Sequence, residues 1–399
     1  MQDLLLLVHR IPYPPNKGDK IRSYHLLKHL AAQYRVHLGT FIDDVDDWRH
    51  VDDVKAFCAD TCFAKLHPVR ARILSLRGFL TGKPLTLTYY RSNELRRWVR
   101  KTMAAHSIQR VVAFSSAMAQ FADEFTHARR VMDFVDVDSD KWAQYAKSKP
   151  WPLSWVYRRE SATLLSYERS VAQRWDASVL VSNDEAELFR RLAPQSASRV
   201  SGISNGVDSD YFSPEHHFAN PFPAGGPVLV FTGAMDYWAN VDAVVWFAQE
   251  VFPKVRAQIQ DARFYIVGSR PSAAVQALGQ HAGVTVTGAV PDVRPYVHYA
   301  VAAVAPLRIA CGIQNKVLEA LSMARPVIAT SAAAEGLKSR PAEAMWVADE
   351  AQDYAQRCIA MLRGEIAPQA GESGRRCVVE HYSWAVNLAR FSELLEPAQ

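Results

Sequence analysis

Cysteine pairs, long apolar runs and low-complexity tracts are absent from this sequence, and each absence excludes a class of protein. The chain of 399 residues holds five cysteines, at positions 58, 62, 311, 358 and 377, and none forms a CxxC pair. An odd set of thiols without zinc spacing argues against a disulfide scaffold or a metal module and favours reduced cysteines. No apolar run approaches the ~20 residues that a membrane-spanning helix needs.

The N-terminal stretch also lacks the features of a targeting signal. Residues 1–10 have no basic segment, and their apolar run covers only residues 4–8. That run is too short for a signal peptide and predicts a first buried strand. The net charge of +5 and the hydrophobic content of 49% are ordinary for a globular protein. So mild a basic balance gives no argument for nucleic-acid binding.

Strand and helix patterns alternate along the chain. Buried strands are predicted at residues 3–8, 36–42, 110–114, 131–135 and 177–181, with helices at 21–33, 161–173 and 184–192. Residues 209–227 are rich in chain breakers, and after them the pattern restarts with strands at 228–231, 263–267, 284–287, 301–305 and 326–330 and helices at 241–258, 272–281 and 314–323. Repeated strand–helix units predict parallel sheets with helices on both faces.

We therefore expect an α/β protein with two Rossmann-like domains, at residues 1–208 and 209–383, whose parallel sheets face each other across a cleft. The last helical stretch, residues 384–399, is expected to pack back on the first domain. Ligands of open parallel sheets bind outside the carboxyl ends of the strands. The loops that follow strands are therefore the places to look for a site.

The most informative segment is residues 305–329, which has the pattern strand, loop, helix, turn, strand. Gly312 lets the backbone approach a ligand, and the free amides at the following helix start form an anion site. These amides belong to Ile313, Gln314 and Asn315. Lys316 and Glu319 lie one turn apart on one helix face. A cation for a diphosphate and a carboxylate for a ribose diol predict a nucleotide site, and the alternative interpretation is a surface ion pair.

This segment resembles the donor-site signature of retaining glycosyltransferases of the GT-B fold, in the large family-4 group. Other segments agree with the resemblance: residues 200–214, with their Asn-Gly-Val-Asp motif, residues 230–236 with Asn240, and residues 266–269 and 286–294. Residues 12–22 and 132–142 are similar to one subgroup, the sugar transferases associated with PEP-CTERM/exosortase exopolysaccharide systems. The resemblance implies transfer of a sugar from a nucleotide sugar to a glycan or lipid-linked acceptor, with retention, in exopolysaccharide or cell-surface glycan synthesis.

The resemblance also implies roles for individual residues. Lys316 and the amides after Gly312 would stabilise the departing diphosphate, and Glu319 would hold the ribose. Further expected donor-site residues are Gly18, Gly233, Arg270, Val290, Asp292 and Arg308. Gly18, Arg270 and Arg308 would lie near the phosphates, and the loops at Gly233 and 290–292 would frame the diphosphate and the base. The alternative for Gly18 is an ordinary turn glycine, and the alternative for Arg270 and Arg308 is an ordinary exposed arginine.

The sequence departs from the family pattern at two places. The family often has two glutamates eight positions apart, but Cys311 stands eight positions before Glu319, and a thiol is a poor replacement hydrogen-bonding group. The family commonly places a histidine near the strand that ends at residue 135, and none follows that strand here. Asp136 is our candidate to orient the acceptor hydroxyl or accept its proton. The alternative is an acidic loop that caps a helix starting near Ser139.

No cofactor or metal is expected, because the resembled fold usually works without a metal and the nucleotide sugar is a substrate. Residues 70–110 hold ten Lys and Arg side chains and one acid, mixed with aromatic residues, and residues 151–159 have a similar character. This pattern predicts peripheral contact with an anionic membrane or a lipid-diphosphate acceptor, and the alternative is a solvated basic face. We accordingly expect a cytoplasmic protein at the inner face of the cytoplasmic membrane, with no nucleic-acid partner.

Three other functions fit a two-domain α/β chain. A nucleotide-sugar epimerase would convert a donor without an acceptor, and a catalytically silent scaffold would bind no nucleotide sugar. A nicotinamide dehydrogenase is disfavoured, because no GxGxxG motif follows any predicted strand.

Overall fold

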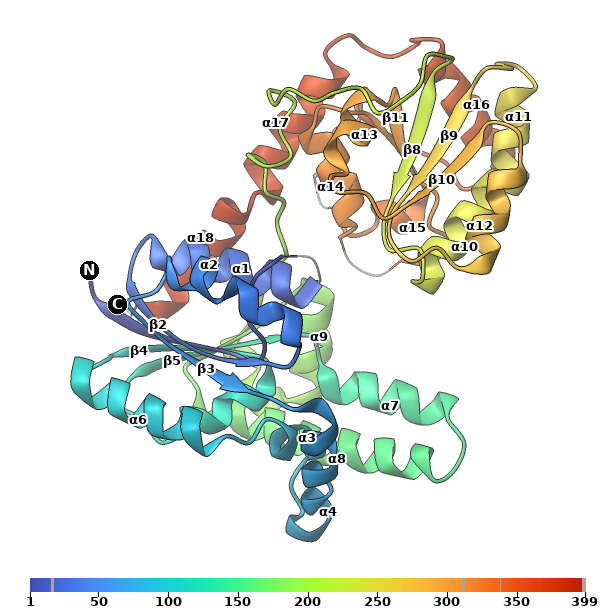
Figure 1. Ribbon diagram of the computed structural model, residues 1–399. Helices are drawn as coiled ribbons and strands as arrows, with labels where there is room; N and C mark the ends of the chain where they lie inside the picture. The colour runs from blue at the N-terminus through green and yellow to red at the C-terminus, as the bar shows by residue number, and fades with distance from the viewer. Residues whose placement is uncertain (16–17, 311–312, 338, 397–399) are drawn as a thin grey trace. The chain divides into compact units, whose positions relative to one another are not determined.

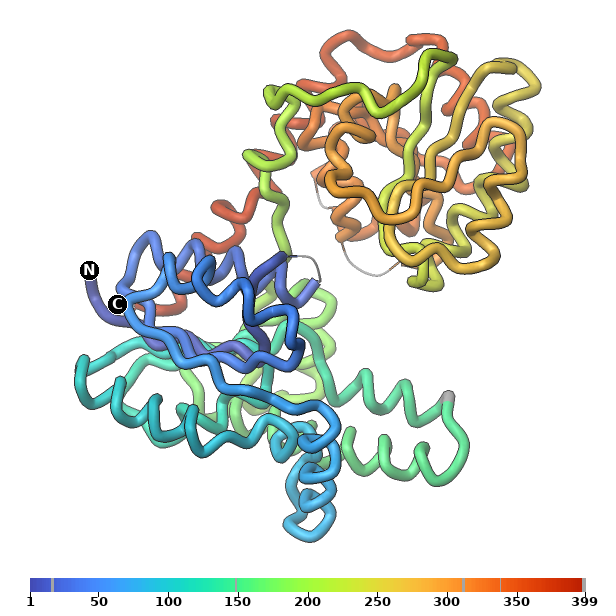
Figure 2. Tube along the Cα trace, viewed as in Figure 1, coloured from blue at the N-terminus to red at the C-terminus, as the bar shows by residue number. Residues whose placement is uncertain are grey.

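The computed structural model describes residues 1–15, 18–310, 313–337 and 339–396, and it divides into two compact units. The first unit holds the chain up to Asn205 together with the described residues from Leu388 onward, and the second holds Gly206–Asn387 (Figure 1). The chain therefore passes between the units twice, at residues 205–206 and at residues 387–388 (Figure 2).

The first unit is built on a seven-stranded parallel sheet with the strand order β3-β2-β1-β4-β5-β6-β7. Its strands are β1 Asp3–Val8, β2 Arg35–Ile42, β3 Asp60–Lys65, β4 Arg110–Phe114, β5 Arg129–Val135, β6 Ala177–Leu180 and β7 Val200–Gly202. The four consecutive leucines of β1 are fully buried, as expected for a strand covered on both faces. Figure 1 shows α1 (Gly18–Ala31) and α2 (Val51–Lys55) over one face and α6 (Asn93–His106) over the other.

The other helices of the first unit are α3 Pro68–Ser75, α4 Arg77–Thr81, α5 Leu85–Tyr89, α7 Asp138–Ser148, α8 Leu153–Arg174 and α9 Asn183–Leu192. The predicted helix at 161–173 thus begins earlier, directly after Pro152. Helix α18 (Trp384–Leu395) closes the unit on the side of α1. Ser392 and His29 are hydrogen-bonded at 2.8 Å, and Arg129 donates to the Leu394 carbonyl at 3.0 Å.

The second unit is built on a six-stranded parallel sheet with the order β10-β9-β8-β11-β12-β13. Its strands are β8 Val228–Thr232, β9 Arg263–Val267, β10 Val284–Gly288, β11 Ala302–Ala305, β12 Val327–Ala329 and β13 Met345–Val347. The expected α/β architecture with two parallel sheets is confirmed. In this parallel sheet the loops after β8, β9, β10 and β11 lie along its carboxyl edge, where the candidate site is found.

The helices of the second unit are α10 Trp238–Trp246, α11 Phe252–Arg256, α12 Ala273–Ala277, α13 Arg294–Tyr299, α14 Asn315–Ser322, α15 Ser331–Ala334, α16 Ala351–Leu362 and α17 Ala370–Tyr382. The single helix expected at 241–258 is interrupted by a π-helical turn at Phe247–Val251. Pro253 explains the interruption, because it has no N–H to donate to the preceding turn. In the described part of the chain, no helix has the length and apolarity needed to cross a bilayer.

Candidate functional site

Helix α14 begins at the carboxyl edge of the second sheet, because it follows the segment that leaves the end of β11. Its inner face packs into the core through Val317, Leu318 and Leu321, so the start of the helix is held firmly. The Gln314 carbonyl accepts the first helical hydrogen bond from the Val317 amide at 3.0 Å. Ile313, Gln314 and Asn315 lie at or next to this helix start, and the anion-binding role of their amides stays a prediction. Gly312 and Cys311 lie outside the described residues.

Lys316 is a half-buried cation held in one place by its neighbours. Its ammonium donates to Asn240 Oδ1 at 2.6 Å and lies 4.2 Å from the centre of the Phe231 ring. Asn240 is itself oriented, because its Nδ2 donates to the Ala234 carbonyl at 2.9 Å. Burial lowers the pKa of Lys316 to about 8, although the nearby Glu319 carboxylate acts to raise it. The site thus contains an ammonium group in a fixed position, and an approaching anion would stabilise its charged form.

Glu319 lies one turn further along the same helix face and is also half-buried. Burial raises the pKa of its carboxyl to about 7, and the Lys316 charge opposes this shift. The two side chains make no direct ion pair, since Lys316 is bonded to Asn240 instead. The surface-ion-pair interpretation of this segment is therefore wrong. Within the described structure no donor is bonded to the Glu319 carboxylate, which leaves it able to accept hydroxyl groups.

Two glycines make room for this arrangement. Gly233 follows β8 with φ of +156°, and a Cβ there would lie 2.8 Å from Asn240 Nδ2 and 3.4 Å from Lys316 Nζ. Gly268 follows β9, and a Cβ there would lie 1.6 Å from the Gly233 carbonyl oxygen. The Met235 amide donates to the Ser269 carbonyl at 2.8 Å, which ties the two loops together. The structure therefore brings Gly233 beside Lys316, as a donor site requires.

Arg270 and Arg308 are both engaged with carboxylates. The Arg270 guanidinium lies 3.1 Å from Asp236, and Arg308 forms a two-point contact with Asp242, including a 3.0 Å bond from its Nε. Both arginine side chains are at least half exposed. A phosphate would have to compete with these carboxylates for the guanidinium donors. The two arginines are therefore weaker candidates for phosphate binding than Lys316.

Asp292 is bound by a neighbour on its own loop. Arg294 donates to it from the backbone at 2.9 Å and from the guanidinium at 2.7 Å, and it also lies over the Tyr211 ring at 3.8 Å. Burial acts to raise the pKa of Asp292, but the Arg294 hydrogen bonds outweigh it and the pKa is lowered. Val290 packs against the core of the second unit. These contacts give the loop a fixed shape; framing of a base by Val290 and Asp292 stays a prediction.

In the first unit, Asp136 follows β5 and accepts a 2.6 Å bond from Lys141, which also lies 3.5 Å from Asp138 at the start of α7. The preceding Val135 has φ of +70°, a rare value for a β-branched residue, and this turns the chain sharply at the strand end. Helix α7 begins at Asp138 with Val137 at its N-cap position and no side-chain capping bond, so the structure gives the capping alternative no support. The role of Asp136 toward an acceptor stays a prediction. Gly18 is the first residue of α1, and a Cβ there would meet nothing within 4 Å, so packing does not require glycine.

A histidine does stand at the carboxyl edge of the first sheet, but it follows β1 and not β5. His9 follows β1, stacks on Phe114 with ring centres 5.8 Å apart, and lies 3.4 Å from the Asp19 carboxylate. Sequence reasoning missed it because the family pattern directed attention to β5. Its signal was its position immediately after the first apolar run. Asn240, the partner of Lys316, was noted only as part of a motif.

Comparison with known proteins supports this description. Residues 226–364 match the family described as Glycosyl transferases group 1. A search of curated proteins found no match. Among solved structures, sucrose-phosphate synthase (tll1590) from Thermosynechococcus elongatus is similar with 19% identity and a TM-score of 0.66, over 99% of this chain and 98% of that chain. A glycosyltransferase from Rickettsia africae ESF-5 has 13% identity and a TM-score of 0.67, over 100% of both chains.

Anabaena Alr3699/HepE, solved in complex with UDP, has 14% identity and a TM-score of 0.64, over 99% of both chains. At these identities the similarities show the fold, which is of the GT-B type. The matched family segment contains α14, Gly233, Asn240 and the loop at Val290, so the family match and the site geometry coincide in the second unit.

Proposed function

We propose that the protein is a glycosyltransferase that moves a sugar from a nucleotide-sugar donor to a glycan or lipid-linked acceptor. The observation that carries this proposal is the positioned Lys316 ammonium beside the Glu319 carboxylate, which accepts no hydrogen bond from a described residue, in α14 within the segment matched by the group 1 family. The cation suits a diphosphate, and the carboxylate suits the two hydroxyls of a ribose. UDP in the HepE complex supports a uridine nucleotide as the first donor to test.

The chemistry assigned to the site is stabilisation of the leaving group. Negative charge builds on the diphosphate as the glycosidic bond breaks, and preorganised donors lower the barrier to that step. We assign this role to Lys316 and the amides of Ile313, Gln314 and Asn315, with Arg270 as an additional contact. No metal or cofactor has a part in the proposal. Retention at the anomeric carbon is proposed from the resemblance to family-4 transferases.

For the acceptor side we propose Asp136 and His9, the two titratable groups that follow β5 and β1 at one edge of the first sheet. Either group would orient the acceptor hydroxyl or take its proton. A role in exopolysaccharide or cell-surface glycan synthesis, and a cytoplasmic location, are proposed from the similarity of residues 12–22 and 132–142 to the PEP-CTERM-associated transferases.

Donor binding tests the proposal directly. We expect one or a few nucleotide sugars in a thermal-shift panel to raise the melting temperature, and the matching nucleoside diphosphate to bind in calorimetry. Glu319→Ala should raise the dissociation constant by about 10- to 100-fold, since hydrogen bonds to a charged group are lost. Glu335→Ala, at an exposed glutamate of the same unit, is the control and should bind as the wild type does. A panel without any binder would favour the scaffold and sink the proposal, whereas donor conversion without acceptor would favour the epimerase.

The pH dependence of binding gives a second test. Because the pKa of Lys316 is lowered to about 8, its charge is lost as pH rises through that value, and the affinity for a nucleoside diphosphate should fall there. In Lys316→Met the affinity should be weaker and nearly independent of pH on the alkaline side. Calorimetric dissociation constants across a series from neutral to alkaline pH measure this. If the affinity of Lys316→Met still fell at alkaline pH as that of the wild type does, the titrating group would be another residue.

A further inference from the structure

Helices α3 and α4 turn their large aliphatic side chains toward solvent. Leu76 joins them with φ of −58° and ψ of −21°, so residues 68–81 form a nearly continuous helix. The solvent-facing side chains are Val69, Ile73, Leu76 and Leu80, with 71%, 63%, 55% and 88% of their surface exposed. At 3.6 residues per turn, these four positions project within an arc of about 60°. We call this row the aliphatic ridge.

The opposite face of the same helix carries small residues and packs on the first unit. Ala71, Ser75 and Gly78 are buried, and a Cβ on Gly78 would lie 2.8 Å from the Lys83 carbonyl oxygen. Arg159 of α8 donates to the Gly78 carbonyl at 2.6 Å. A surface helix normally buries its apolar stripe, and this helix does the reverse. Packing within the unit therefore does not explain the ridge, and a continuous exposed apolar row indicates an interaction surface.

The apolar surface continues from the ridge onto the neighbouring helix α8. The Phe79 ring of α4 stacks on the Trp155 ring, with centres 5.7 Å apart and planes 8° from parallel. Trp151 and Leu153, next to the start of α8, are also exposed. Tryptophan favours the boundary between lipid headgroups and acyl chains, which adds an interfacial anchor to the ridge.

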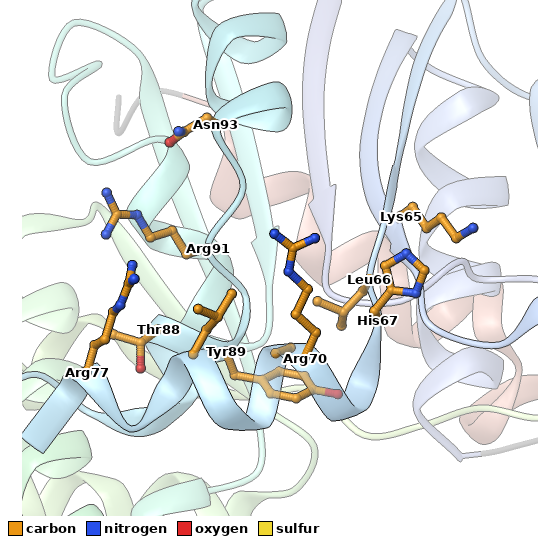
Figure 3. Close-up of a pocket in the computed structure, with 11 residues that line it drawn as sticks. Lys65, Leu66, His67, Arg70, Arg77, Thr88, Tyr89, Arg91 and Asn93 are labelled. Carbon is orange, nitrogen blue, oxygen red and sulfur yellow. The ribbon is translucent and has the colours of Figure 1, made fainter.

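A cavity of about 390 Å³ opens beside the ridge and is lined by cations. Its basic residues are Lys65, Arg70, Arg77 and Arg91, and Figure 3 shows the three guanidinium groups projecting to one side of the helix. We call it the basic pocket. No lining residue is a carboxylate, and none of the four cations has an ion-pair partner in the described part of the chain. Arg70 and Arg77 belong to the ridge helix and project about 70–90° around its axis from the centre of the ridge, so the pocket flanks the ridge.

We propose that the ridge and the pocket beside it dock together on an anionic bilayer, with the aliphatic ridge entering the outer acyl layer and one lipid phosphate held in the basic pocket. Cations without ion-pair partners among the described residues complement the negative charge of such a surface. Transfer of the aliphatic side chains from water to the acyl layer lowers the free energy of the bound state. A nucleic acid would use the cations but leave the ridge in water. The inference goes beyond nucleotide-sugar transfer, since docking needs neither donor nor acceptor.

Vesicle sedimentation of the full chain tests the ridge. The wild-type protein should bind vesicles of phosphatidylcholine that contain phosphatidylglycerol and should bind pure phosphatidylcholine far less. Replacement of the four ridge residues by serine should weaken binding more than about tenfold, because the buried apolar area is lost. These positions are exposed, so the variant should fold, which circular dichroism checks. Val45→Ser, at an 80% exposed valine outside this face, is the control and should bind normally.

The basic pocket is tested with matched charge changes. The triple variant Arg70→Gln, Arg77→Gln, Arg91→Gln should lose binding by on the order of 100-fold, since each cation near an anionic surface contributes about 1 kcal/mol. Arg191→Gln, Arg376→Gln, Arg390→Gln removes the same charge from other exposed positions and should bind nearly as the wild type does.

If both triple variants lost vesicle binding equally, net charge would explain the effect, and the basic pocket would be overturned as a lipid site. Unchanged vesicle binding in the ridge variant would overturn the ridge. Loss of self-association in that variant, without any vesicle binding by the wild type, would assign the ridge to a protein interface instead. Nucleoside-diphosphate affinity is measured in parallel and should be the same in every ridge and pocket variant, so failure here is distinguishable from failure of the proposed function.

Discussion

Replacement of Lys316 by methionine is expected to lower the turnover of the preferred nucleotide sugar by about 100- to 1000-fold, the usual effect of removing one preorganised donor from a developing negative charge. Methionine keeps an unbranched side chain of similar length but loses the ammonium that lies over the Phe231 ring and donates to Asn240, so it cannot donate to a phosphate. The rate of nucleoside-diphosphate release in the presence of acceptor measures the effect. The melting temperature should stay close to that of the wild type, because the Glu319 carboxyl, whose pKa burial raises to about 7, can take up a proton when the Lys316 charge is removed.

Lys254→Met is the matched control for this prediction. Lys254 is exposed on α11 of the same unit, and its ammonium donates to the Glu250 carbonyl. That variant should turn over at the wild-type rate. A wild-type rate in Lys316→Met as well would remove Lys316 from the reaction and leave α14 as a structural helix.

The largest stability effect is expected at the ion pair between Arg22 and Asp133. Arg22 Nε lies 2.9 Å from the Asp133 carboxylate, and both side chains are only 1% exposed. The guanidinium also donates to the Ile203 carbonyl at 2.9 Å, which connects α1, β5 and the end of the first unit. Arg22→Met leaves a buried carboxylate without its counter-charge, and the free energy of unfolding should fall by about 3–5 kcal/mol.

Urea unfolding measures this loss, and two further variants make it specific. Burial raises the pKa of Asp133 while Arg22 opposes the shift, so the neutral double variant Arg22→Met, Asp133→Asn should recover part of the stability. Lys55→Met breaks an exposed pair with Asp52 and should change the free energy by less than about 1 kcal/mol. An Arg22→Met variant as stable as the wild type would show that the carboxylate is solvated or already neutral.

The parts of the fold that the sequence predicted are those that depend on local pattern. The runs at residues 3–8, 110–114 and 263–267 are buried strands with the predicted bounds, because a continuous apolar run suits a strand covered on both faces. The position of α14 could be predicted for a similar reason. Its apolar residues recur with helical spacing between two strand-like runs, and Pro326 marks the return to the sheet.

The parts that could not be predicted depend on contacts between distant residues. Arg22 and Asp133 are far apart in the chain, and no spacing rule connects them. Asn240 fixes Lys316 from another helix, and His9 reaches the sheet edge from β1 while the family pattern pointed to β5. In the ridge helix the sequence pattern predicts the wrong buried face. The large apolar residues have the spacing of a buried face but are exposed, and the small residues on the opposite face are buried.

The central claim is that the start of α14 holds the nucleotide part of an activated sugar. A crystal structure of the full chain with the nucleoside diphosphate selected by calorimetry tests it most directly. We expect a phosphate oxygen within hydrogen-bond distance of Lys316 Nζ and the ribose hydroxyls hydrogen-bonded to the Glu319 carboxylate. A nucleotide bound elsewhere on the second unit, with Lys316 still bonded only to Asn240, would contradict it.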